Sequence, residues 1–133
     1  MNNSLIALFG EAEKGSFQTP IHIKNLSQLC DVFGHPPEHT FGINFAIRSL
    51  LSEKELIFLR VQEEGFSVED YIQGIHLLEK ATTNTHLSAI CMPGVGNDEI
   101  IDATFRLCEK RGSIFIASPQ DLYDYLTMKS QIA

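Results

Sequence analysis

The segment from Ser67 to Ser118 alternates twice between helix-like and strand-like patterns, and this alternation restricts the fold more than any other feature of the chain. After Ser67, apolar residues recur at helical spacing, and Thr85–Met92 is then an apolar run of strand length. A second helical pattern begins at Asn97, and a second strand pattern covers Ser113–Ala117. Such an order requires parallel strands joined by crossovers, with helices on the faces of the sheet. The sequence therefore predicts an α/β fold with a mainly parallel central sheet.

The first half of the chain adds strands and helices to this pattern. The predicted elements are strands over Leu5–Phe9, Thr19–Ile23 and Glu55–Val61, and helices over Leu26–Phe33 and Phe41–Leu51. The predicted N-caps are Asn25, Ser67 with Asp70 as a capping-box partner, Asn97, and Ser118 with Pro119 following, while Gly34 and Gly112 end their helices. The last helix is predicted to reach about Lys129. A length of 133 residues fits a single domain over residues 1–133.

Charge and composition restrict the partners. The formal net charge of −7 argues against nucleic acid and anionic membranes, because both bind proteins through clustered positive charge. The apolar run near the amino terminus lacks a basic flank and is too short to span a bilayer. Three cysteines without framework spacing fit buried free thiols in a reducing compartment, and we expect a cytoplasmic protein.

The segment His35–His39 has the HxxEH spacing of one class of zinc peptidases. That chemistry needs both imidazoles on one helical face. Pro36 and Pro37 prevent a helix there, so the segment is predicted to be an exposed turn. We expect no metal site.

The segment Gly10–Ser16 has the glycine spacing of a P-loop, but Ser16 stands where the loop needs lysine. An extended segment follows instead of a helix, and Glu11 and Glu13 would repel a phosphate. We interpret Gly10–Ser16 as a turn between strands.

The turn Cys91–Gly96 lies between a strand and a helix, where open α/β sheets usually bind ligands. Gly94, Gly96 and Asn97 are the candidate nucleotide-binding residues at this turn. However, Asp98 and Glu99 already place negative charge at the start of the following helix. We interpret the turn as structural and expect no cofactor.

Nucleophilic catalysis by Cys91 would require a histidine within reach. His86 lies five residues away on the predicted strand, and an odd separation directs the two side chains to opposite faces. We therefore assign no catalytic residue.

Three stretches, in order, resemble the contractile tail sheath family of phages and related injection systems. They are LFGEAEKGSFQTPIHIKNLSQLCDVFG, FAIRSLLSEKELIFLRV, and DYIQGIHLLEK followed by THLSAICMPGVGNDEIIDATFRLCEKRGSIFIAS. The resemblance runs from about Leu5 to Pro119 and covers only the compact core of the family. Its members are usually longer and carry terminal arms that pair as strands with neighbouring subunits.

The resemblance implies a sheath-core-like domain with a structural role. We expect a non-enzymatic assembly module, a truncated sheath-like subunit, that associates with itself or with a phage-tail-like partner protein. An edge strand is a template for a partner's strand. Within Thr19–Lys24, Pro20, Ile21, His22 and Ile23 are the expected contact residues. One alternative is a small-molecule or nucleotide-binding regulatory domain that uses the Met92–Asn97 turn, and another is a hydrolase or thiol enzyme centred on Cys91.

Overall fold

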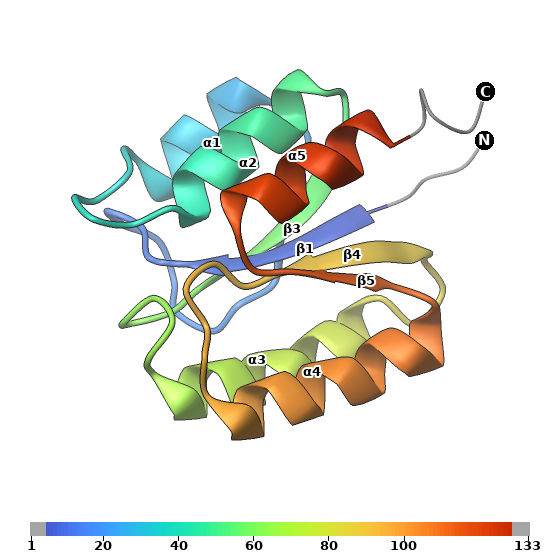
Figure 1. Ribbon diagram of the computed structural model, residues 1–133. Coiled ribbons are helices and arrows are strands. Elements are labelled where there is room, and N and C mark those ends of the chain that lie inside the picture. The colour runs from blue at the N-terminus through green and yellow to red at the C-terminus, as the bar shows by residue number, and fades with distance from the viewer. Residues whose placement is uncertain (1–4, 129–133) are drawn as a thin grey trace.

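A computed structural model describes residues 5–128 and has a five-stranded sheet at its centre (Figure 1). The strands are β1 (Leu5–Gly10), β2 (Ile21–Ile23), β3 (Glu55–Arg60), β4 (Leu87–Cys91) and β5 (Ile114–Ile116). They lie in the order β2-β3-β1-β4-β5, and every neighbouring pair is parallel except β2 and β3. The predicted α/β fold with a mainly parallel sheet is confirmed.

Helices cover both faces of the sheet (Figure 1). One layer contains α1 (Leu26–Phe33), α2 (Gly42–Leu51) and α5 (Pro119–Thr127), and the other contains α3 (Val68–Ala81) and α4 (Asp98–Arg111). The connection from β1 to β3 includes α2 on one face, whereas β3 connects to β4 through α3 on the other, so the sheet is doubly wound. Among residues 5–128, no helix combines the length and the apolar character needed to span a membrane.

The core lies on both sides of β1, which is buried along its whole length. Leu5, Ala7 and Phe9 pack in the cluster under α3 and α4, while Ile6 and Leu8 pack in the cluster under the other helical layer. This explains why the strand has a continuous apolar sequence rather than an alternating one.

Three predicted N-caps are confirmed. The side-chain oxygens of Asn25, Asn97 and Ser118 accept hydrogen bonds from backbone N–H groups three residues on, at 2.8, 3.1 and 3.1 Å. Gly34 and Gly112 end α1 and α4, as predicted. The last helix ends at Thr127, and Lys129 lies outside the described residues.

Ser67 occupies the N-cap position of α3, as predicted, but the predicted capping box is wrong. The Ser67 side chain makes no cap hydrogen bond, and its hydroxyl instead donates to the Glu63 carbonyl oxygen (3.0 Å). Asp70 is buried, and its carboxylate accepts from the Gln18 side chain (2.6 Å) and the Gln62 backbone N–H (2.7 Å). Asp70 therefore ties the segment before β2 to the β3–α3 loop.

Candidate functional site

The carboxyl ends of β1 and β4 are where a doubly wound sheet of this order places a ligand. The two strands are neighbours, and their outgoing connections cross opposite faces of the sheet, which opens a crevice between the connecting loops. Gly10 and Glu11 lie at the end of β1, and the Met92–Asn97 turn lies after β4. The protein side chains that lie in this crevice distinguish the ligand-binding interpretation of the Met92–Asn97 turn from the structural one.

The Glu64 carboxylate, from the β3–α3 loop, binds the backbone at this end of the sheet. Its Oε1 accepts from the N–H groups of Glu11 (3.0 Å) and Gly42 (3.1 Å), and its Oε2 accepts from Phe41 (2.6 Å). The Glu11 carboxylate in turn accepts from the Glu64 N–H (2.9 Å). A negative side chain of the protein thus occupies the start of α2, where the helix dipole and free N–H groups favour an anion. We call Glu64 and Glu11 with these bonds the carboxylate clasp.

Two pairs of glycines allow the backbone to approach closely around the clasp. A Cβ atom on Gly42 would lie 2.8 Å from the Gly10 Cα atom and 2.9 Å from Glu64 Oε1. A Cβ atom on Gly65 would lie 2.7 Å from the Gly94 carbonyl oxygen. The β3–α3 loop is therefore packed directly against both the start of α2 and the Met92–Asn97 turn.

Burial raises the pKa values of two groups at this end of the sheet, Glu64 and Tyr71. Desolvation raises the pKa of Glu64, because the three backbone N–H donors only partly replace the lost water and the Glu11 charge adds repulsion. Burial also raises the pKa of Tyr71, whose hydroxyl accepts from the Gly65 N–H (2.6 Å). Tyr71 is therefore a neutral hydrogen-bonding group beside the loop.

The Met92–Asn97 turn is engaged by the chain itself. Gly94 adopts a positive φ of 81°, and its N–H lies 3.4 Å from the Ala117 carbonyl oxygen. The Asn97 side chain caps α4. Gly96 is exposed, and a Cβ atom added to it would meet no other atom within 4 Å. Of the candidate residues Gly94, Gly96 and Asn97, two are thus held by internal contacts.

The predicted contact strand is at an edge of the sheet. Among its residues, Ile23 is buried, Pro20 and Ile21 are half-buried, and His22 is exposed. Because β2 pairs with β3 alone, its other side faces away from the sheet. There the Gln28 side chain donates to the His22 carbonyl oxygen and accepts from the Lys24 N–H, both at 2.8 Å.

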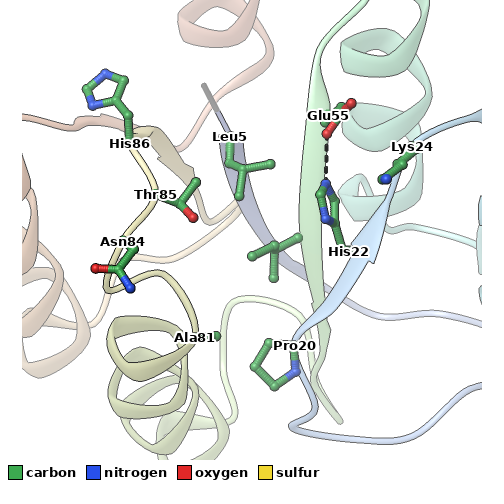
Figure 2. A pocket seen from close by; sticks show the side chains of 10 residues that line it. Leu5, Pro20, His22, Lys24, Glu55, Ala81, Asn84, Thr85 and His86 are labelled. Atoms are coloured by element: carbon green, nitrogen blue, oxygen red, sulfur yellow. Dashed lines mark hydrogen bonds and ion pairs between the residues drawn. The ribbon is translucent and has the colours of Figure 1, made fainter. Parts of the chain in front are cut away.

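A hollow of about 710 Å³ lies beside β2, at the amino-terminal end of β1 and β3 (Figure 2). It is lined by Leu5, Pro20, His22, Lys24, Glu55, Ile57, Ala81, Asn84, Thr85 and His86. One wall comes from β2 and the start of β3, where His22 Nε2 lies 2.9 Å from Glu55 Oε1. The other wall is the turn between α3 and β4, and Leu5 lies between the two walls (Figure 2). Pro20 and His22, two of the predicted contact residues, thus line the same concave surface.

The thiol and histidine patterns do not converge on a catalytic arrangement. Cys91 is fully buried, and burial raises the pKa of its thiol, whereas His86 is exposed. His35 and His39 lie in an exposed turn, as predicted. In the part of the chain covered by the structure, no three His, Cys, Asp or Glu side chains are arranged to hold a metal ion.

Sequence reasoning missed the carboxylate clasp and the hollow. The run Gln62-Glu63-Glu64-Gly65 directly after a buried strand was an available signal, because polar residues at that end of a parallel strand often face the ligand crevice. No sequence signal connects Glu64 to Phe41 and Gly42. The residues of the α3–β4 turn show no helical or strand periodicity, so their sequence did not indicate that they line a hollow.

Fold and site together define a doubly wound α/β protein in which two carboxylates of the chain itself, Glu11 and Glu64, lie at the carboxyl ends of the strands. In comparisons with protein-family models, curated proteins and solved structures, nothing matches this chain. The resemblance to the tail sheath family therefore stays a prediction from the sequence.

Proposed function

We propose that this protein is a non-enzymatic assembly module, a truncated sheath-like subunit, which associates with itself or with a phage-tail-like partner through an edge of its sheet. The observation that carries the proposal is that the sheet is open. Within residues 5–128, β2 and β5 each pair with one neighbour only. An open edge offers backbone hydrogen-bonding groups to another chain.

The carboxylate clasp, at the carboxyl ends of the strands, supports a structural role for that region rather than a ligand-binding one. Glu64 fills the position at the start of α2 that a phosphate would take. A nucleotide at the Met92–Asn97 turn would bring its phosphates towards Glu11 and Glu64. Like charges would repel, so this alternative requires the β3–α3 loop to move first.

The two edges differ in how open they are. At β2, the Gln28 side chain covers the His22 carbonyl and the Lys24 N–H, so a partner strand must displace this amide. At β5, the Ile116 carbonyl accepts from the Met92 N–H (2.8 Å) and thus faces β4. Because backbone groups alternate sides along a strand, those of Phe115 face outward.

Apolar side chains accompany the β5 edge. Ile114 is 40 % exposed, and Phe105 of α4 is 51 % exposed and packs edge-on against Phe115, with the ring centroids 5.4 Å apart. Exposed apolar groups beside unpaired backbone are typical of surfaces that bind another chain. We therefore assign β5 as the readily available edge and β2 as an edge that Gln28 guards.

Light scattering over a concentration series from micromolar to millimolar tests the proposal. We expect the mean mass to rise with concentration. Ile114→Lys, which adds a charge at the β5 edge, should reduce the association without unfolding the protein, because the side chain is already partly exposed.

Gln28→Ala tests the other edge, and Gln73→Ala on the exposed side of α3 is its matched control. If β2 is the contact, uncovering it should strengthen association in Gln28→Ala alone. A protein that stays strictly monomeric in all variants, and that binds no purified sheath or tube protein, would overturn the proposal.

A further inference from the structure

The hollow beside β2 contains polar side chains that the protein leaves unused. Among residues 5–128, no hydrogen bond or ion pair involves the Lys24 ammonium, the Asn84 amide, the Thr85 hydroxyl or the His86 ring. A volume of about 710 Å³ is in the usual range for small-molecule sites. The hollow lies on the face of the sheet that α3 and α4 cover, next to the edge strand β2, because its lining residues Leu5 and Ile57 belong to the apolar cluster on that face.

The β2 wall offers one fixed imidazole and one free cation. Glu55 Oε1 lies 2.9 Å from His22 Nε2 and so holds the ring in place. Because a carboxylate only accepts hydrogen bonds, Nε2 donates to Glu55, and Nδ1 is left for a ligand. Lys24, directly after the end of β2, lines the same wall, and its charge is not compensated by any ion pair to residues 5–128.

The opposite wall is held by α4. The Arg111 guanidinium donates to the Thr82 carbonyl (2.8 Å), the Thr82 hydroxyl (3.1 Å) and the Glu79 carbonyl (2.9 Å). The Thr85 N–H then donates to the Thr82 carbonyl (3.2 Å). These bonds fix the turn that presents Asn84 and Thr85 towards the hollow, so both walls are formed without a ligand (Figure 2).

We propose that this hollow binds a small hydroxylated organic anion of the sugar-phosphate or sugar-acid class. Lys24 would bind the anionic group, because an ammonium forms strong charge-assisted hydrogen bonds with phosphate and carboxylate. His22 Nδ1, the Thr85 hydroxyl and the Asn84 amide supply both acceptors and donors for ligand hydroxyls.

The apolar parts of the hollow fit the same ligand class. Its apolar lining comes from Leu5, Ile57, Pro20 and Ala81. Such a surface packs against the C–H groups of a sugar ring, while the polar groups around it bind the hydroxyls. This site is at the opposite end of the sheet from the Met92–Asn97 turn. The proposal of this site does not rest on the assembly role proposed above, although Pro20 and His22 line the hollow and also belong to the predicted contact strand.

Nuclear magnetic resonance titration of ¹⁵N-labelled full-length protein tests the site, with glucose 6-phosphate, gluconate, glucose and inorganic phosphate as separate probes. We expect saturable shifts at the amides of Lys24, Asn84 and Thr85, and none at Gly112. Glucose 6-phosphate or gluconate should bind more tightly than glucose or phosphate alone, because only they engage both the ammonium and the hydroxyl-binding groups.

The variants separate the proposed site from general attraction of anions. Lys24→Met should weaken binding about tenfold or more, a difference of about 1.4 kcal/mol. Lys14→Met, which removes an exposed positive charge from the β1–β2 connection, should leave the affinity unchanged. Absence of saturable shifts at the two walls with every probe would overturn the proposal, and so would equal losses in both lysine variants.

Discussion

The Glu64 carboxylate links the β3–α3 loop to the end of β1 and the start of α2. It accepts hydrogen bonds from three backbone N–H groups at the carboxyl ends of the strands, and these bonds favour the ionised form. Burial and the nearby Glu11 charge act in the other direction and prevail, so the pKa of Glu64 is raised. A group with a raised pKa binds its proton more tightly in the folded protein than in the unfolded chain. Its contribution to stability is therefore complete below the unfolded pKa and is lost as the pH rises through the folded pKa.

Glu64→Gln should remove this pH dependence. We expect the stability of the wild type, relative to the variant, to be highest below pH ~4.5 and to decline as the pH rises towards neutrality. Urea unfolding at several pH values measures the difference. Glu38→Gln, in an exposed turn, is the control and should leave the pH profile of the wild type unchanged. If the relative stability instead increases with pH, the three N–H donors dominate and the assigned direction is wrong.

Gly42 and Gly96 distinguish a glycine required by packing from one that is dispensable. An alanine Cβ at Gly42 would meet the Gly10 backbone at 2.8 Å, so Gly42→Ala should destabilise the protein by about 1–3 kcal/mol. Gly96→Ala meets nothing within 4 Å and should be neutral or slightly stabilising. Chemical denaturation of both variants gives the comparison. Equal effects would show that the close approach of Gly10 and Gly42 has no energetic role.

Residues with distant partners were the ones that sequence patterns could not predict. Asp70 has the spacing of a capping-box partner for Ser67, and that local pattern was misleading. Its carboxylate instead binds Gln18, 52 positions away, and Gln62. Glu64 likewise binds Phe41 and Gly42, at separations of 23 and 22 positions. Such contacts depend on the completed sheet, and no short pattern encodes them.

Helix ends were predictable because their signals are local. Asn25, Asn97 and Ser118 each bind an N–H three residues on, within a single turn. Gly112 has a left-handed conformation with φ of 69°, which glycine adopts without strain. The connections between elements were harder to predict from the sequence. Thr85 and His86 have strand-like composition, but β4 begins only at Leu87 because the Thr85 N–H closes a turn with Thr82.

Arg111 joins two helices and the turn that follows α3. It satisfies carbonyl groups at the end of α3, which have no partner within that helix. Arg111→Met should therefore lower the free energy of unfolding by on the order of 2 kcal/mol, because partly buried carbonyls lose a charged donor. Thermal or urea unfolding measures the loss.

Lys110→Met is the matched control for Arg111. Lys110 lies on the same helix, and its ammonium forms an exposed ion pair with Glu79 at 2.5 Å. An exposed pair of this kind contributes little, so the variant should stay within about 0.5 kcal/mol of the wild type. A comparable loss in both variants would mean that Arg111 acts as a general surface charge rather than as a cap for α3.

At the scale of the whole molecule, the sheet separates two apolar clusters, and β1, β3 and β4 each contribute residues to both. Its parallel character followed from the alternation of strands and helices, whereas the order β2-β3-β1-β4-β5 did not. Apolar runs such as Leu5–Phe9 indicate burial on both faces but do not identify the neighbouring strands. The antiparallel position of β2 at an edge depends on the length and path of the segment between Gly10 and Ile21, which carries no periodic signal.

The alkylation rates of the three cysteines measure how readily different parts of the fold open. Cys30 is exposed on α1, Cys108 is 8 % exposed on α4, and Cys91 is fully buried in β4 between β1 and β5. Burial raises the pKa of Cys108 to about 11 and that of Cys91 further. Only the thiolate reacts, and only when a reagent reaches it. We therefore expect alkylation in the order Cys30, Cys108, Cys91.

Mass spectrometry of peptides alkylated for different times, at several urea concentrations below the unfolding transition, gives the three rates separately. The Cys91 rate should increase with urea as steeply as global unfolding does, because the thiol becomes accessible only when the central sheet separates. The Cys30 rate should be almost independent of urea. Rapid alkylation of Cys91 without urea would contradict this, since it would require a local opening beside β4. It would also favour the thiol-enzyme alternative, because a catalytic cysteine must be accessible as its thiolate in the native protein.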